Sequence, residues 1–439
     1  MEKSKHIYER AIKTTPGGVH SNSRARIPYP QYFVKGDGAW LYDVDGNKYI
    51  DMVLGNGSIF FGHNYQPFME KFHANLKKCE GLTTGVETIL AVEAAEKFLE
   101  IIPAERVRFA NTGTEAIIHV MQMARAHTGK NDFALVEGAY NGWVDAVNIS
   151  TFPALKDVGE ITRPKAVAGG GGLDYRSLEA AVIVPFNDLE TTEKLLEENK
   201  DRLAALILEP VMIDIGFVEP ERGYLQGLRD ICDRLGILLV FDELLCGFRM
   251  PEGSCQKWFG VTPDLSIFGK AIANGHIMSA VAGKADVMET IASKGTASFV
   301  GTFNGHAYSA AATLAALELM QDGSARRKLE DNVQYLKKRF EESAKKYGIT
   351  AMLRGHGGHL HWYFADKIEN YRDAASENIQ NYMTFAEAML EQGIFVIPKP
   401  LSHHAISVSH DENVIEKIAV AMDLSLIHIS EPTRRVVIS

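Results

Sequence analysis

The sequence predicts an α/β fold with a mostly parallel central sheet and a smaller α+β portion that draws on both ends of the chain. Three short apolar runs in the middle of the chain indicate buried parallel strands, at residues 181–185, 204–208 and 236–241. Between the last two runs, residues 224–235 place their apolar side chains on one face at helical spacing. A strand, a helix and a strand in this order are typical of a parallel sheet covered by helices.

The two ends of the chain follow another pattern. Residues 43–47 indicate a turn between two strand-like pieces, and long amphipathic helices alternate with short strands beyond residue 310. We therefore expect residues 1–45 and 311–423 to form a smaller domain around a large domain at 46–310. The last stretch, 424–439, resembles translated cloning sequence, and we expect it to be a non-native, poorly ordered tail.

Composition excludes several classes of protein. A formal net charge of −10 over 439 residues argues against nucleic-acid binding, which needs a concentrated basic face. No apolar run is long enough to span a membrane, and the N-terminus lacks the apolar stretch of a signal peptide. The four cysteines show no C-x-x-C spacing, so we expect reduced thiols, no metal site and a cytoplasmic protein.

Asp242 is the first candidate for chemistry. The apolar residues 237–241 run directly into Asp242 and Glu243. Taken alone, this pattern also describes an acidic strand end that is merely solvated. In parallel sheets, however, ligands bind beyond the carboxyl ends of the strands. We therefore expect Asp242 to meet a cationic group of a ligand.

Lys270 is the second candidate. It follows the short apolar run 265–268, and residues 271–275 carry no charge. A lone lysine is more often a surface cation. A lysine held in an apolar pocket can lose its proton near neutral pH, because desolvation disfavours the ammonium, and it can then attack an aldehyde.

The third candidate is the segment 111–116, where Thr112 and Glu115 have the spacing of a capping box. That spacing by itself indicates only a well-capped helix. Gly113 lets the backbone approach an anion closely, and the helix-start N–H groups and the Thr114 hydroxyl supply donors. The chain has no G-x-x-x-x-G-K or G-x-G-x-x-G at this point, which favours a lone phosphate over a nucleotide.

These three segments together predict one ligand, pyridoxal phosphate (PLP). Its phosphate suits residues 113–114, its aldehyde suits Lys270, and its ring nitrogen suits a carboxylate such as Asp242. PLP acts as an electron sink that makes the Cα proton of a bound amine acidic. We expect Lys270 to hold it as a Schiff base and then to act as general base and acid.

The element D-E-x-x-x-G-F-R at 242–249, the P-D-L before the lysine, and Glu209-Pro210 with Gly216 resemble the class III aminotransferases. Within that family the chain is most similar to the glutamate-1-semialdehyde 2,1-aminomutase-like branch, from about residue 16 to residue 423. The resemblance implies PLP fold type I, like aspartate aminotransferase, in the large domain. It also implies the Schiff-base role for Lys270 and the pyridine-partner role for Asp242.

The resemblance implies further cofactor contacts. Gly113 and Thr114 correspond to the phosphate-binding turn, and Tyr140 to the aromatic residue that stacks on the cofactor ring; ordinary packing is the alternative for this tyrosine. Leu244 stands where the family usually has valine. Thr302 corresponds to a threonine that reaches the phosphate of the neighbouring subunit, which implies a homodimer with shared active sites.

The identity of the substrate is less constrained. In the segment 16–24, Arg24 corresponds to an arginine that binds a substrate carboxylate in some members, with Arg26 as its rival and a surface role as the alternative. Ser402 stands where the aminomutase pattern has a glutamate, and residues 273–278 lack the usual run of glycines. These departures favour transamination between an amino acid or amine and a keto acid or aldehyde. An aminomutase or epimerase is the alternative, and a non-enzymatic binding module is a third hypothesis.

Overall fold

A seven-stranded sheet in the order β4-β12-β11-β10-β9-β5-β8 lies at the centre of the computed structural model, which describes residues 2–430. Neighbouring strands run parallel except where β12 pairs with β11 and β4. The mostly parallel sheet confirms the predicted α/β class. The strands are β4 (Arg106–Ala110), β5 (Asp132–Val136), β8 (Val182–Val184), β9 (Leu203–Leu208), β10 (Leu238–Asp242), β11 (Leu265–Phe268) and β12 (Ser279–Gly283).

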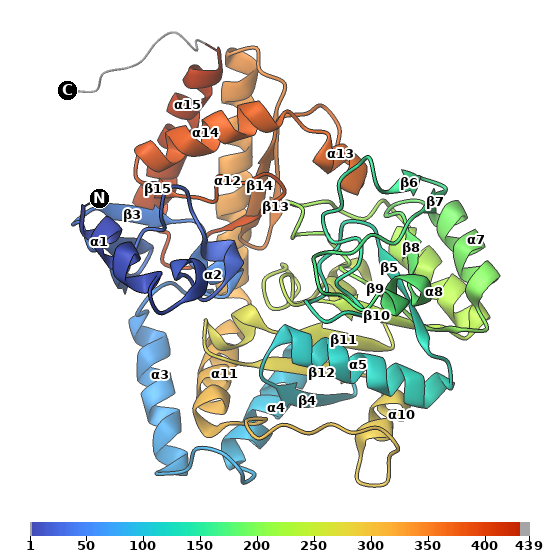
Figure 1. Cartoon of the computed structure of the whole chain (residues 1–439). Helices are drawn as coiled ribbons and strands as arrows, with labels where there is room; N and C mark the ends of the chain where they lie inside the picture. The colour runs from blue at the N-terminus through green and yellow to red at the C-terminus, as the bar shows by residue number, and fades with distance from the viewer. Residues whose placement is uncertain (1, 431–439) are drawn as a thin grey trace.

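Helices cover both faces of this sheet (Figure 1). On β10, Val240 belongs to the apolar cluster that includes α5 (Gly113–Thr128), whereas Leu239 and Phe241 belong to the cluster that includes α8 (Tyr224–Leu235). Successive side chains of a strand point to opposite faces, so a strand buried on both faces is apolar throughout. This burial explains the continuous apolar runs in the sequence.

The helical pattern at 224–235 forms α8 with the predicted bounds. The helix ends because Gly236 adopts the left-handed conformation, with φ of 62°, which glycine tolerates best. Further helices of this part of the chain are α3 (Gln66–Leu76), α4 (Ile89–Ile101), α6 (Arg176–Ala180), α7 (Leu189–Asn199), α9 (Cys255–Phe259), α10 (Ala285–Met288) and α11 (Ala307–Met320).

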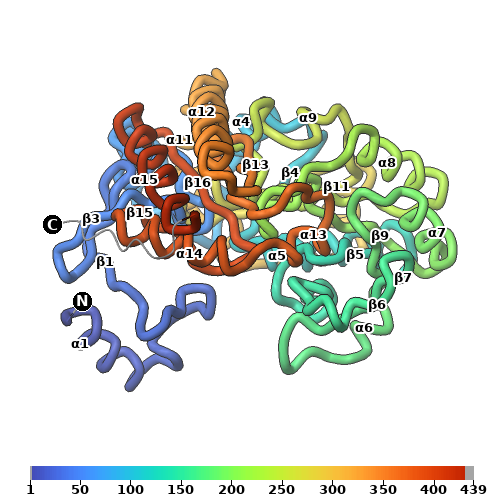
Figure 2. Tube along the Cα trace, turned by 90° about the horizontal axis from the view of Figure 1, so that it is seen from above, coloured from blue at the N-terminus to red at the C-terminus, as the bar shows by residue number. Residues whose placement is uncertain are grey.

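A second sheet joins the two ends of the chain. It has the order β1-β2-β3-β15, and β15 (Ile394–Phe395) pairs parallel with β3 (Lys48–Asp51). Figure 2 shows β1, β3 and β15 close together. The other strands are β1 (Phe33–Asp37) and β2 (Trp40–Asp43). Because β3 pairs with β2 and β15, we propose that the N-terminal part of the smaller domain extends through residue 51.

A third sheet, in the order β13-β14-β16, lies between the C-terminal helices and the large sheet (Figure 1). Its strands are β13 (Met352–His356), β14 (His359–Tyr363) and β16 (His404–Ala405). The surrounding long helices are α12 (Ser324–Lys346), α14 (Ile379–Glu391) and α15 (Glu412–Ser430). The remaining short elements are α1 (Glu2–Ala11), α2 (Leu54–Gly57), α13 (Tyr371–Ala375), β6 (Gly159–Glu160) and β7 (Arg163–Pro164).

The expectation of poor order from residue 424 onward is wrong as far as Ser430, because α15 continues to that residue. Ile418, Met422 and Leu426 are buried at a spacing of four residues, so the tail continues the apolar face of the helix. Residues 431–439 lie outside the described residues, and the non-native origin of the tail stays a prediction.

The four cysteines are free and buried, in line with the expected thiols. Within residues 2–430, no helix combines the length and the apolar character needed to cross a membrane.

Candidate active site

The candidate residues lie at one edge of the central sheet. β10 ends at Asp242, and β11 ends two residues before Lys270. These strands are parallel neighbours in which Asp242 pairs with Ile267, and the N–H of Glu243 donates to the carbonyl of Ile267 at 2.9 Å. Because carboxyl ends of parallel strands meet at the same edge, Asp242 and Lys270 are brought to the same place.

Leu244 connects this edge to the start of α5. A Cβ atom added at Gly113 would lie 2.6 Å from Cδ1 of Leu244, and one added at Gly269 would lie 2.6 Å from its Cδ2. The side chain of Leu244 therefore packs directly against both glycines. The three segments singled out in the sequence are in mutual contact around this one side chain.

Asp242 is a buried carboxylate with two hydrogen-bond donors. Nδ2 of Asn141 donates to its Oδ2 at 2.9 Å, and the N–H of Leu244 donates to its Oδ1 at 3.1 Å. Burial raises the pKa of Asp242 to about 6, although both hydrogen bonds and the charge of Lys270 act in the opposite direction. A carboxylate in this setting is stabilised by any further cation that approaches it.

Lys270 begins a short 3-10 helix, Lys270–Ala273, with a left-handed backbone at φ of 50°. Residues other than glycine rarely adopt this region, and such strain is concentrated at functional sites. Within residues 2–430, its side chain makes no hydrogen bond or ion pair. Its charge opposes the burial that raises the pKa of Asp242, and it helps to lower the pKa of Asp214, which places the amine near two carboxylates.

The start of α5 is capped by side chains. Oγ1 of Thr112 accepts from the N–H of Glu115 at 3.2 Å, and the Glu115 carboxylate accepts from the N–H of Asn111 at 2.8 Å. The N–H groups of Gly113 and Thr114 belong to the first turn of the helix, where no helical carbonyl is available to accept a hydrogen bond from them. This helix start therefore offers unpaired donors to an anion.

Tyr140 lies on the loop that follows β5, and 39% of it is exposed. Burial raises its pKa, and the nearby carboxylates of Asp214 and Asp242 add to the rise. The same loop approaches α5, since a Cβ atom added at Gly142 would lie 3.1 Å from Oγ1 of Thr114. The loop that carries Tyr140 therefore lies beside Asp242, through Asn141, and beside the helix start, through Gly142.

Sequence reasoning missed three polar groups of this site. Asn141, which orients Asp242, is adjacent to Tyr140, but nothing in the sequence pairs it with a residue 101 positions away. The carboxylate of Glu209 accepts from the backbone N–H groups of Tyr140, Ile213 and Asp214. Glu209 follows β9 directly, and that position is the signal that could have found it.

Asp214 is the third missed group. Its Oδ1 lies 3.4 Å from Nδ1 of His403. Burial alone would raise the pKa of Asp214, but the hydrogen bond from His403 and the charge of Lys270 bring it below its usual value. The charge of Lys270 therefore acts on this carboxylate, whose direct partner, His403, comes from the other end of the chain.

Thr302 is exposed, and its backbone carbonyl accepts a hydrogen bond from the Thr84 hydroxyl. The neighbouring Asn304 accepts from Nδ2 of Asn111 at 3.0 Å, so this segment lies beside the start of α5. It borders an open cleft of about 910 Å³ between α4 and residues 299–305. Several apolar side chains are exposed along this face: Val86, Ile89, Val92, Val300 and Phe303.

The two arginines of the entry segment differ in their surroundings. Arg24 is exposed, and no hydrogen bond or ion pair of its side chain occurs within residues 2–430. Arg26 is half-buried, and burial lowers its pKa. Burial lowers the pKa of His404, and the charge of Arg26 contributes to the same shift, so Arg26 lies near this buried ring.

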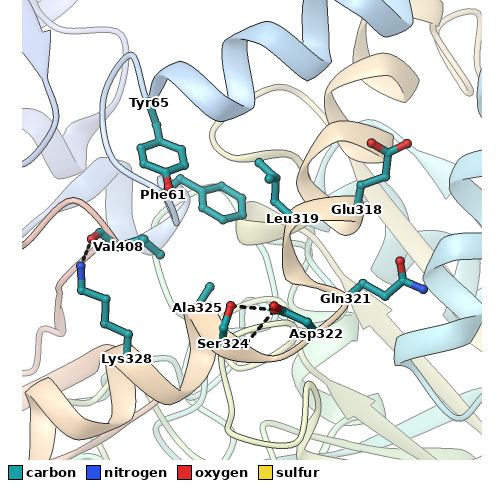
Figure 3. A pocket seen from close by; sticks show the side chains of 10 residues that line it. All are labelled: Phe61, Tyr65, Glu318, Leu319, Gln321, Asp322, Ser324, Ala325, Lys328 and Val408. Atoms are coloured by element: carbon teal, nitrogen blue, oxygen red, sulfur yellow. Dashed lines mark hydrogen bonds between the residues drawn. The ribbon is translucent and has the colours of Figure 1, made fainter.

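A separate open cleft of about 590 Å³ lies where α11 leads into α12 (Figure 3). The stacked rings of Phe61 and Tyr65 form one wall, and Lys328 donates to the carbonyl of Val408 at its edge. None of the predicted site residues lines this cleft.

The residues at the sheet edge fit PLP group by group. The start of α5 offers N–H donors for the phosphate, the buried Asp242 suits a protonated ring nitrogen, and Lys270 is an amine without a partner in the described chain. Gly113 has no room for a side chain because Leu244 fills that space.

Comparisons with known proteins agree with this fit. The family model for "Aminotransferase class-III" matches residues 22–412. The glutamate-1-semialdehyde 2,1-aminomutase of Methanosphaera stadtmanae is 34% identical over 97% of this chain and 98% of its own length. An omega-transaminase from Sphaerobacter thermophilus has a TM-score of 0.91 and 30% identity over 97% of both chains. A transaminase solved with PLP bound has a TM-score of 0.87 and 27% identity over 98% of both chains.

These matches cover nearly the whole chain, and they confirm both the resemblance inferred from residues 242–270 and the predicted PLP cofactor. The chain is an enzyme, and it belongs to the class III aminotransferase family.

Proposed function

We propose that the chain transfers an amino group from an amine or amino acid to a separate carbonyl acceptor. The observation that carries the proposal is the contact of Leu244 with both Gly113 and Gly269, which gathers the helix start, Asp242 and Lys270 at one sheet edge. An amine, a carboxylate and an anion site in one place are what a PLP-dependent transfer needs.

Each of these residues has a role in the proposal. When bound, PLP withdraws electrons from the Cα of an attached amine and makes its proton acidic. Lys270 then moves that proton as general base and acid. Asp242, oriented by Asn141, holds the proton on the ring nitrogen, while Gly113 and Thr114 bind the phosphate. Tyr140 covers the ring.

Ser402 favours transamination over isomerisation. Its hydroxyl donates to the carbonyl of Lys399 at 2.8 Å and shares a 3.0 Å hydrogen bond with Tyr382. The position of the aminomutase glutamate is therefore filled by a small group that is already engaged within the protein. The Sphaerobacter omega-transaminase, at 30% identity, supports the same choice.

An aminomutase is the second candidate, because the Methanosphaera relative at 34% identity carries that name. The two reactions differ in stoichiometry. A transaminase needs two substrates, whereas an aminomutase rearranges glutamate-1-semialdehyde without an acceptor.

The test is a donor screen of the PLP-loaded enzyme. Amino acids, β-amino acids and simple amines are each offered with and without pyruvate or 2-oxoglutarate, and glutamate-1-semialdehyde is offered alone. We expect product only when both donor and acceptor are present, and no turnover by Lys270→Ala. Isomerisation of glutamate-1-semialdehyde without an acceptor would support the aminomutase instead.

For the substrate carboxylate, the surroundings of the two arginines favour Arg26 over Arg24. We expect Arg26→Gln to raise KM for carboxylate-bearing donors about 10- to 100-fold, because a charge-assisted hydrogen bond to the carboxylate is lost. KM for donors without a carboxylate should stay the same. Arg24→Gln is the matched control and should leave both KM values unchanged. If Arg24→Gln raises KM for carboxylate-bearing donors and Arg26→Gln does not, Arg24 binds the substrate carboxylate instead.

We also propose that two copies of the chain pair through the apolar face beside Thr302. Exposed side chains such as Val300 and Phe303 continue directly from the segment that contacts the start of α5. In this arrangement Thr302 of one subunit reaches the phosphate site of the other. Buried free thiols and a charge of −10 are compatible with work in the cytoplasm, which we propose as its location.

A further inference from the structure

Thr302 lies at the corner of a tight turn within a long loop. Residues 292–306 form no helix or strand. Within this loop the N–H of Asn304 donates to the carbonyl of Gly301 at 3.1 Å, which closes a turn with Thr302 and Phe303 at its corner. Both corner residues are exposed. A loop of this kind keeps one position only if it is anchored to the rest of the chain.

The first anchor is Phe299, three residues before Thr302. Its ring stacks on the ring of His119, a buried residue of α5, with the centroids 3.8 Å apart and the planes 14° apart. The guanidinium of Arg108, on β4, lies over the same ring at 5.3 Å from its centroid. Stacking and cation–π contacts both favour a fixed ring position, so Phe299 holds the loop against the side of α5.

The second anchor is the segment that precedes α4. The hydroxyl of Thr84 donates to the backbone carbonyl of Thr302, and the N–H of Ala307 donates to the carbonyl of Thr83 at 2.8 Å. These bonds hold the backbone of the loop. The hydroxyl of Thr302 itself makes no hydrogen bond within residues 2–430, so it is available to a ligand outside its own chain.

The third anchor is the side chain of Asn304. Its Oδ1 accepts from Nδ2 of Asn111 at 3.0 Å. The orientation of both amides is determined, because Nδ2 of Asn111 also donates to the carboxylate of Glu115 at 3.0 Å, and an ionised carboxylate can only accept. A Cβ atom added at Gly301 would lie 2.5 Å from Oδ1 of Asn304, so this side chain lies across the turn that carries Thr302.

The third anchor differs from the others in where it leads. Glu115 belongs to the first turn of α5, and Asn111 lies two residues before Gly113. The hydrogen bonds therefore run from the proposed phosphate site of one subunit to the turn that carries its Thr302. Because Gly301 and Gly305 flank residues 302–304, the local backbone restrains this turn weakly, and the side-chain contact matters more.

We propose that Asn304 is a positioning residue for the cofactor: held by Asn111, it directs the hydroxyl of Thr302 to the phosphate bound in the partner subunit. Thr302 donates to a phosphate oxygen, and a hydrogen bond to a charged group is stronger than one between neutral groups when its geometry is right. Without the contact to Asn111, the turn is free to move and this hydrogen bond weakens. The inference rests on the proposed dimer with shared sites.

The experiment compares two ligands that differ only in the phosphate, PLP and pyridoxal. Each is titrated into the protein after removal of PLP, and Kd is measured from the change in absorbance on binding. We expect Asn304→Ala to raise Kd for PLP about tenfold and to leave Kd for pyridoxal within about twofold, because only the phosphate contact is weakened. An unchanged Kd for PLP, or an equal rise for both ligands, would overturn the proposal.

A double variant shows whether Asn304 acts through Thr302. Thr302→Ala removes the hydroxyl and should raise Kd for PLP about 10- to 100-fold. In the Thr302→Ala background, Asn304→Ala should change Kd by less than about twofold, because no hydroxyl is left to position. A further tenfold rise in that background would show that Asn304 does not act through Thr302, as expected of a merely structural residue.

Ser298→Ala is the matched control. Ser298 is exposed on the same loop, and its side chain makes no hydrogen bond within residues 2–430. This variant should bind both ligands like the wild type. Light scattering shows whether each variant keeps the mass of the wild type. If Asn304→Ala does not, Asn304→Gln takes its place with the same expected result, because it keeps the amide but moves its oxygen by one methylene.

The outcomes separate this inference from the proposed function. If Thr302→Ala leaves Kd for PLP unchanged, the shared phosphate site of the proposed dimer is wrong, and the role of Asn304 is wrong with it. If Thr302→Ala raises Kd for PLP and Asn304→Ala does not, the shared site stands and the positioning role of Asn304 alone is contradicted.

Discussion

At the scale of single residues, burial decides the chemistry of the site. Asp242 would be an ordinary surface acid if its strand ended in solvent. Instead it is only 4% exposed, and its charge is supported by Asn141 and by the Leu244 N–H. The cofactor-free protein therefore contains a carboxyl group that ionises only at a cost, and a cation at this position relieves that cost.

This gives a prediction for the stability of the cofactor-free protein. In the folded state the pKa of Asp242 is about 6, which is above the ordinary value that applies in the unfolded state. At any pH between these two pKa values, the folded state therefore binds more protons than the unfolded state. Stability therefore falls as pH rises through this window, by about 1 kcal/mol between pH 5 and pH 7. Urea midpoints at both pH values should show a steeper decline for the wild type than for Asp242→Asn. Parallel declines would contradict the raised pKa.

Single residues also show how far sequence reasoning reaches. Lys270 and Asp242 could be found because each follows an apolar strand, and position after a strand is a local signal. Asn141, Asp214 and His403 could not, because their roles depend on contacts between distant parts of the chain; Asn141 and Asp242 are 101 positions apart. The adjacent pair His403-His404 was visible, but only the fold brings it beside β14.

At the scale of elements, the start of α5 and the loop after β10 are fitted to each other through Gly113 and Leu244. The helix and strand signals were predictable because the period of the apolar residues repeats over several positions, as in α8. The tail was misjudged for a related reason. Its apolar spacing continues α15 to Ser430, whatever the origin of those residues.

We predict that Gly113→Ala destabilises the cofactor-free protein by about 1–3 kcal/mol, because the new Cβ meets Leu244 in a packed space. Leu244→Ala removes the side chain that the new Cβ meets. The double variant should therefore lose less free energy of unfolding than the sum of the two single losses, by about 1 kcal/mol. Unfolding midpoints of the four proteins measure this coupling. Additive effects would mean that the two segments do not touch.

At the scale of the whole molecule, the single chain leaves the apolar face beside Thr302 uncovered. Val300 is 79% exposed and Phe303 is 57% exposed, and both belong to the segment that contacts the start of α5. A second copy that covers this face would bury these side chains and bring Thr302 to its partner's phosphate site. The sequence indicated this pairing only through family resemblance.

We predict that Val300→Glu converts the dimer to a monomer and removes most of the activity, because a charge buried at an interface is strongly unfavourable. Light scattering coupled to size-exclusion chromatography measures the mass. Val420→Glu, at an exposed position on α15, is the control and should leave the mass unchanged. A wild-type protein that runs as a monomer at micromolar concentration would contradict the proposed pairing.

The most direct measurement is chemical identification of the lysine that holds the cofactor. The enzyme is incubated with PLP, reduced with borohydride and digested, and the peptide that carries the cofactor is sequenced by mass spectrometry. The account predicts a single labelled residue, Lys270, and no label in Lys270→Arg. A label on another lysine, or one spread over several surface lysines, would contradict the assignment of this sheet edge as the active site.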